Sequence, residues 1–201
     1  MSTNFLDKAY AARDSDSTRD LYNEWSATYE AEVGAHGYAA PTRCAEALAA
    51  CVADKTTPLL DFGCGTGLAG LAFRLAGFEV IDGVDISAEM LAQARAKNIY
   101  RTLTQIEPDA KLGGDYTLIS AVGVIGAGAA PLSTLDTLLH ALPRDGKLVF
   151  SFNDHALADP ANTGRLNEWL DCGAARLLSM DHGPHLPGKN LSSTVYVVEK
   201  A

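Results

Sequence analysis

No apolar stretch of this sequence is long enough to cross a membrane as a helix. A spanning helix needs roughly 18 or more consecutive apolar residues, and polar residues interrupt every hydrophobic run before that length. The start of the chain also lacks a basic region followed by an apolar core, which is the pattern of a secretory signal peptide. We therefore expect no membrane partner and a cytoplasmic location.

Basic residues and paired cysteines are also scarce. Sixteen Lys and Arg stand against twenty-five Asp and Glu, which gives a formal net charge of −9. Because nucleic-acid binding depends on clustered cations that neutralise phosphates, this balance argues against a nucleic-acid partner. The four cysteines, at positions 44, 51, 64 and 172, form no C-x-x-C pair and have no histidine at metal-ligand spacing. We therefore expect no metal site.

The length and composition are those of one globular domain. A chain of 201 residues, 47% of them hydrophobic, can bury one sizeable core. We expect residues 1–20 to be a mobile N-terminal segment and residues 21–201 to form a single domain. Two helical patterns within 21–53, broken around Gly34 to Pro41, predict a helical cap at the start of that domain.

Strand-like and helix-like stretches alternate through the rest of the chain. This alternation predicts an α/β fold with a parallel, doubly wound sheet. Two final strands follow each other without a helix between them, which predicts an antiparallel hairpin. The expected strands are 59–62, 78–84, 100–103, 115–121, 147–153, 174–181 and 191–199, the expected helices are 67–76, 87–97, 132–141 and 162–172, and 182–190 is expected to be a loop.

The segment 58–67, PLLDFGCGTG, joins the end of a buried strand to three glycines at alternate positions. Glycines there let the backbone turn sharply and approach a ligand closely. The apolar run from Leu68 to Leu75 predicts a helix whose free amide groups face that ligand. Asp85 ends the next strand, where an acid can bind both hydroxyls of a ribose. Loop and acid together predict a nucleoside cofactor.

Asp61 indicates which nucleoside. A G-x-G-x-x-G pattern at Gly65, Gly67 and Gly70 is compatible with a dinucleotide fold that seats a pyrophosphate on a helix N-terminus. However, Asp61 lies at the strand end just before the glycine loop, and a fixed carboxylate there would repel phosphates and attract positive charge. The charge therefore favours a cofactor with ammonium and sulfonium groups, such as S-adenosylmethionine.

Two segments carry a family resemblance. Residues 60–67, LDFGCGTG, resemble the first motif of class I S-adenosylmethionine-dependent methyltransferases, and 83–91, GVDISAEML, resemble the segment that follows it. The resemblance covers roughly residues 20–200. It implies a Rossmann-like, mostly parallel seven-stranded sheet with an antiparallel last strand and an N-terminal helical cap.

The resemblance also implies which residues contact the cofactor. Residues 21–29, LYNEWSATY, are similar to the N-terminal helix that small-molecule members fold over the cofactor; the alternative is that their aromatic residues form the apolar stripe of an amphipathic helix. Residues 120–128 resemble the segment whose backbone carbonyl holds the cofactor ammonium, or they form a flexible glycine loop. Residues 105–107 are the nearest match to the adenine contacts, although the segment after them is short. The expected contacts are Tyr22, Trp25, Asp61, Gly63, Cys64, Gly65, Gly67, Asp85, Ile86, Met90, Ile106, Glu107 and Ala121.

The expected reaction is in-line attack of an oxygen, nitrogen or carbon nucleophile of a small molecule on the cofactor methyl group, accelerated largely by alignment. His155, just past the fifth strand, is the candidate general base, with a solvated loop histidine as the alternative. Two other functions stay open. A NAD-dependent oxidoreductase would need a catalytic pair such as Tyr-x-x-x-Lys, which is not apparent, and a non-catalytic S-adenosylmethionine-binding module would need none.

Overall fold

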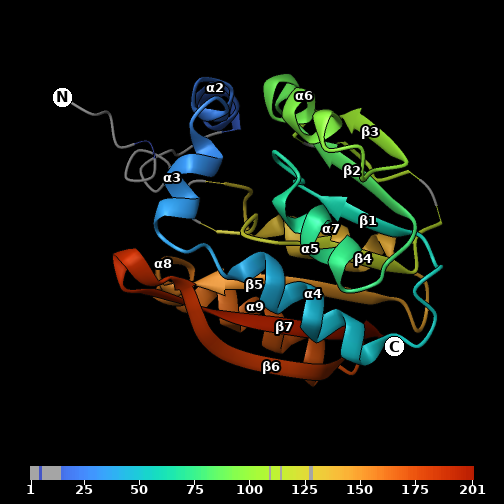
Figure 1. Cartoon of the computed structure of the whole chain (residues 1–201). Coiled ribbons are helices and arrows are strands. Elements are labelled where there is room, and N and C mark those ends of the chain that lie inside the picture. The colour runs from blue at the N-terminus through green and yellow to red at the C-terminus, as the bar shows by residue number, and fades with distance from the viewer. Residues whose placement is uncertain (1–4, 6–14, 109, 114, 127–128) are drawn as a thin grey trace.

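The computed structural model describes residues 5, 15–108, 110–113, 115–126 and 129–201. In these residues the strands form a seven-stranded sheet with the order β3-β2-β1-β4-β5-β7-β6 (Figure 1). Strands β1 to β5 are parallel, and β7 is antiparallel to both β5 and β6. The predicted fold class is therefore confirmed. The strands are β1 (Leu59–Phe62), β2 (Ile81–Asp85), β3 (Thr102–Gln105), β4 (Leu118–Ala121), β5 (Lys147–Asn153), β6 (Ala175–Leu186) and β7 (Leu191–Lys200).

The central strands are buried on both faces and are mostly apolar, with single polar positions such as Asp61 and Ser120. Successive side chains of a strand point to opposite faces, so Leu59 and Leu60 belong to two different hydrophobic clusters. The cluster of Leu60 packs against α7 (Ser133–Ala141) and α9 (Pro160–Asp171). The cluster of Leu59 packs against α4 (Ala40–Cys51) and α5 (Leu68–Leu75), which lie on the opposite face (Figure 1).

The N-terminal helices differ from the predicted cap. The structure has three of them in the described part of 15–53: α2 (Ser15–Trp25), α3 (Tyr29–Ala35) and α4. Only α2 and α3 lie outside the sheet layers; α4 was predicted as cap but packs on β5 and β7. Residues 15–20, expected to be mobile, belong to α2, and residues 1–4 and 6–14 of that segment lie outside the described residues. We call α2 and α3 the cover helices.

The C-terminal hairpin is longer than predicted. Residues 182–186, expected to be a loop, continue β6 and pair with β7, and the turn is the short helix η1 (Pro187–Lys189). Arg43 on α4 explains the extension, because its guanidinium donates to the carbonyl oxygens of Asp181 and Pro184 at 2.8 and 2.9 Å. Sequence patterning could not find a contact that spans about 140 residues. It also missed α8 (Asp154–Leu157).

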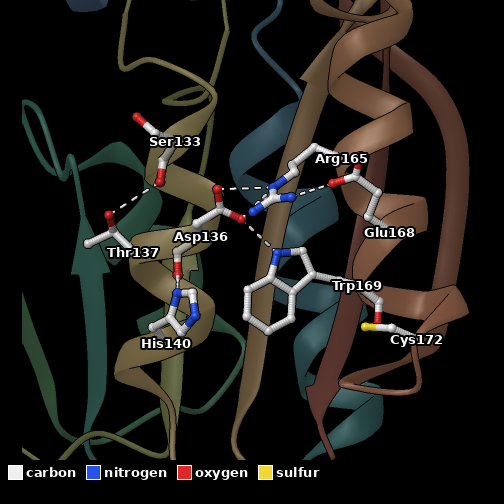
Figure 2. A network of polar contacts seen from close by, with 8 residues as sticks. All are labelled: Ser133, Asp136, Thr137, His140, Arg165, Glu168, Trp169 and Cys172. Carbon is white, nitrogen blue, oxygen red and sulfur yellow. Dashed lines mark hydrogen bonds and ion pairs between the residues drawn. The ribbon is translucent and has the colours of Figure 1, made fainter.

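A polar network ties α7 to α9 on the outer side of the sheet (Figure 2). Asp136 accepts hydrogen bonds from Arg165 Nε at 2.8 Å and from Trp169 Nε1 at 2.7 Å. Arg165 also pairs with Glu168, one turn further along α9. Trp169 is buried, whereas Glu168 is exposed. The buried N–H of Trp169 therefore depends on Asp136 as its acceptor.

We predict that Asp136→Ala lowers the free energy of unfolding by about 1.5–3 kcal/mol, because it leaves the buried Trp169 N–H without its acceptor. Glu168→Ala is the matched control. It also removes a carboxylate from Arg165, but one that is exposed, so it should cost about 0.5 kcal/mol or less. Urea unfolding of both variants is the measurement, and equal losses would contradict the assignment.

Candidate functional site

A cavity opens where the parallel strands end and is lined in part by residues of the cover helices. It encloses about 850 Å³ of empty space, counting the open solvent at its mouth. Ligand sites of open α/β sheets lie at this edge. Its wall is formed by residues at the ends of four parallel strands, by the cover helices and by a few neighbouring residues. At the strand ends these are Phe62, Gly63 and Gly65 at or after β1, Asp85 and Ile86 at β2, Ile106 and Pro108 after β3, and Val122, Gly123 and Val124 after β4. The cover helices contribute Thr18, Tyr22 and Tyr29, and the remaining wall residues are Met90, Ala129, Ala130, Pro131 and Thr134. We call it the strand-end cavity.

The glycine loop turns back at Gly65, which has a positive φ of 53°. A Cβ atom added to Gly65 would have no atom within 4 Å, although the residue belongs to the cavity wall. Gly65 therefore leaves room beside the main chain where a ligand can approach. At Gly63 the space is already taken, because an added Cβ would lie 2.5 Å from a Val124 methyl group.

Asp85 holds the two turns of the site together. Its Oδ2 accepts from the backbone N–H of Gly65 at 2.8 Å, and its Oδ1 accepts from the N–H of Ser87 at 2.9 Å. Burial raises the pKa of Asp85, and these backbone hydrogen bonds act against that rise. A carboxylate offers about four lone-pair sites, so both oxygens can accept a further hydrogen bond from a ligand in the cavity.

Asp61 lies behind the loop and not in the cavity wall. Its side chain is 1% exposed and accepts hydrogen bonds from the hydroxyls of Tyr100 and Ser120 at 2.7 and 2.8 Å. Burial, with a smaller contribution from the charge of Asp85, raises the pKa of Asp61 to about 6, although these two hydrogen bonds act to lower it. The charge predicted from the sequence is present, but Asp61 could act on a ligand only through its field.

The position of the Tyr100 side chain explains why several neighbouring positions are glycine. A Cβ atom on Gly67, Gly70 or Gly83 would lie 3.1, 2.3 or 3.0 Å from an atom of the Tyr100 side chain. The tyrosine ring therefore needs all three positions bare to reach Asp61. This packing accounts for two glycines of the G-x-G-x-x-G pattern without a pyrophosphate. No sequence signal pointed to Tyr100.

We predict that Tyr100→Phe destabilises the protein more at pH 8 than at pH 5. The pKa of Asp61 is already raised from 3.8 to about 6 in the folded state, so stability falls as pH rises through that window. Removing the Tyr100 donor raises this pKa further. The loss should reach about 1.5–3 kcal/mol at pH 8, where Asp61 is charged, and be smaller at pH 5.

Urea unfolding at the two pH values measures this difference. Tyr196→Phe is the control, because Tyr196 is also a buried tyrosine of the sheet region but its hydroxyl is hydrogen-bonded to Thr194 and not to a carboxylate. A Tyr100→Phe loss that is the same at both pH values would contradict the role of Asp61.

The cover helices contribute aromatic residues to the site. Tyr22 lines the cavity, as predicted, and so do Thr18 and Tyr29. Trp25 does not: it is 1% exposed and packs between Phe5, Tyr22 and Tyr29. Two tyrosines of the cover helices therefore line the cavity, while Trp25 belongs to an apolar cluster; contact between Tyr22 and a cofactor stays a prediction.

The remaining expected contacts divide into two groups. Ile86, Met90 and Ile106 belong to the wall. The others lie outside the described wall: Cys64 and Ala121 are buried, Gly67 caps α5, and Glu107 is exposed and pairs with Arg19 of α2 at 3.6 Å. His155, the candidate base, is exposed on α8 and is not part of the described wall either.

Sequence reasoning missed much of the wall after β4. Val122, Val124, Pro131 and Thr134 carry no chemical signal, because apolar and hydroxyl side chains occur anywhere in a fold. Thr18 was missed for another reason, since it lies in the segment that was expected to be mobile. Residues 120–128 were expected to hold the cofactor ammonium through a backbone carbonyl or to form a flexible glycine loop, and 127–128 lie outside the described residues.

Sequence comparison supplies the family. A family model described as "Methyltransferase domain" matches residues 36–194. The chain belongs to this family. It is 30% identical over 124 residues to "Methyltransferase-like protein 27" of Homo sapiens, an alignment that covers 59% of this chain. The chain spans about half of that relative, 51% of its length.

Solved structures agree with the fold of this methyltransferase. The magnesium protoporphyrin IX methyltransferase (ChlM) from Synechocystis PCC 6803 with bound SAM has a TM-score of 0.62 and 16% identity, covering 100% of this chain and 92% of its own. The putative methyltransferase in complex with the Haloferax volcanii Trm112 activator has a TM-score of 0.68 and 14% identity, covering 91% and 97%. At such identities the likeness concerns the fold alone.

Family and fold together place a methyltransferase domain with the class I fold in this chain. None of the helices in the described ranges is both long and apolar enough to cross a membrane. Among the same residues, no group of three or more His, Cys, Asp or Glu side chains is placed to hold a metal ion.

Proposed function

We propose that this methyltransferase binds S-adenosylmethionine in the strand-end cavity and transfers its methyl group to an uncharged small molecule. The observation that carries the proposal is the pairing of Gly65 with Asp85. Gly65 leaves open space beside the main chain, and the carboxylate that accepts its N–H has lone pairs left for the two hydroxyls of a ribose. We expect the protein to act in the cytoplasm.

The chain offers groups for the ribose, the base and the charged sulfur of this cofactor. Asp85 would take the ribose hydroxyls, and the apolar Ile86 and Ile106 would enclose the base. Tyr22 covers the cavity from α2. When bound, S-adenosylmethionine supplies a methyl group on a positively charged sulfur. Asp61 and Asp85, both buried and acidic, provide a negative field suited to that charge.

The wall supports a small and uncharged methyl acceptor. Among its described residues Asp85 is the only charged one, and the wall after β4 is made of Val, Gly, Ala, Pro and Thr. A carboxylate or phosphate of an acceptor would find no cation there, and the net charge of −9 disfavours a nucleic acid. The chain would serve mainly to align the acceptor and to exclude water. The exposed position of His155 lends no support to its role as a base.

We predict that S-adenosylhomocysteine raises the melting temperature and NAD does not. A ligand that binds only the folded state adds RT ln(1 + [L]/Kd) to stability, about 2.7 kcal/mol at one hundred times Kd. Thermal melting with each ligand, followed by calorimetry, makes the comparison. Stabilisation by NAD alone would contradict the proposed cofactor.

We predict that Gly65→Ala abolishes S-adenosylhomocysteine binding while lowering stability by only about 1–2 kcal/mol, the cost of a non-glycine residue at positive φ. Gly173→Ala is the matched control. Gly173 also has a positive φ, 73°, and open space around its Cβ position, but it lies after α9 and outside the described cavity wall. If both variants melt alike and both bind the ligand normally, Gly65 has only a structural role.

A further inference from the structure

Side chains of α6 (Ala88–Ala96) and of its two flanking residues form three of the contacts that hold the cover helices, beside the Arg19–Glu107 ion pair and the apolar cluster of Trp25, Val33 and Leu186. Ser87 Oγ donates to Asn23 Oδ1 on α2 at 2.5 Å, and Gln93 Nε2 donates to the carbonyl oxygen of Ser26 at 2.7 Å. Lys97 forms an ion pair with Glu30 on α3. These contacts place α2 beside α6, as Figure 1 shows.

The contact between Ser87 and Asn23 differs from the others because Ser87 also belongs to the site. Its backbone N–H donates to Asp85 Oδ1 at 2.9 Å, and its side chain is fully buried. The serine oxygen accepts the N–H of Met90 at 3.1 Å as the N-cap of α6. A hydroxyl has one proton, and here that proton is directed to Asn23.

A continuous chain of hydrogen bonds therefore runs from the glycine loop to the cover: Gly65 to Asp85, Asp85 to Ser87, and Ser87 to Asn23. Asn23 follows Tyr22 directly, and Thr18 lies on the same helix one turn and a half earlier. Both of these residues line the strand-end cavity. Through Ser87, the contact of Asn23 thus attaches α2, which closes the cavity, to the carboxylate of Asp85 on the opposite side of the cavity.

We propose that Asn23 is a positioning residue for the cofactor, which acts through Ser87 to couple closure of α2 over the cavity to the hydrogen bonding of Asp85. This inference rests on the proposed function. A ligand that binds Asp85 in its present orientation keeps Ser87 in place. Ser87 then holds Asn23, and with it the neighbouring Tyr22, over the ligand. Gln93 and Lys97 attach the same cover without contact to Asp85, so they hold it but do not couple it to the site.

The test compares Asn23→Ala with Gln93→Ala. Each removes one neutral hydrogen bond between α6 and the cover at a partly buried position. We expect Asn23→Ala to weaken S-adenosylhomocysteine binding about three- to tenfold, the effect of one neutral hydrogen bond, and Gln93→Ala to change it less than twofold. Calorimetry measures the affinities, and melting of each variant without ligand checks that it folds. Asn23→Leu, which also lacks the acceptor, replaces the alanine variant if that one does not fold.

Hydrogen exchange of the α2 amides supplies a second readout that a merely structural contact would not change. In the unmodified protein the ligand should slow exchange in α2, and in Asn23→Ala saturating ligand should no longer do so. Equal loss of affinity in the Asn23 and Gln93 variants, or unchanged ligand-dependent protection of α2 in Asn23→Ala, would overturn the proposal. If the unmodified protein does not bind S-adenosylhomocysteine at all, the proposed function fails instead.

Discussion

The carboxylate of Asp85 joins the two turns on which the strand-end cavity depends. Strands β1 and β2 are parallel neighbours, so the turns that follow them emerge at the same edge of the sheet. Asp85 bridges these turns by accepting one backbone N–H from each, those of Gly65 and Ser87. Without this bridge, the backbone N–H groups of Gly65 and Ser87 would lose the acceptor that they share.

A second buried acid sits behind the same loop at a cost in stability. Asp61 is enclosed with Tyr100 and Ser120, and its raised pKa means that ionisation at neutral pH opposes folding. A cation in the cavity would offset part of that cost for both Asp61 and Asp85. The site is therefore better suited to a positively charged ligand than to the pyrophosphate that its glycine spacing also allows.

The family match shows a methyltransferase domain, and the wall of the cavity narrows the acceptor that we propose. Its described part combines two tyrosines with apolar and small residues, and Asp85 alone carries a charge. Recognition of the acceptor would then depend on shape and on exclusion of water more than on ion pairing. Recognition of the cofactor would depend instead on charge and hydrogen bonding.

Local patterns in the sequence were enough to predict the sheet, its parallel order and the turns that bear Gly65 and Asp85. Strand alternation, glycine spacing and an acid at a strand end are short-range signals, and β1 and β5 were predicted to the residue. Ser87 at the start of α6 follows a local rule, because serine commonly caps a helix N-terminus, but its bond to Asn23 does not.

The tertiary structure alone decided which of the candidate residues face the cavity. Asp61 turned away from it because Tyr100, nearly forty residues later, fills the space that three bare glycines leave. Residues 182–186 became strand by pairing with β7, and Arg43 on α4 binds the Pro184 carbonyl oxygen within them. Asn23 met Ser87 only because α2 folds back onto α6. Each of these contacts joins segments that are distant along the chain, so its partner is set by packing and leaves no pattern in the neighbouring sequence.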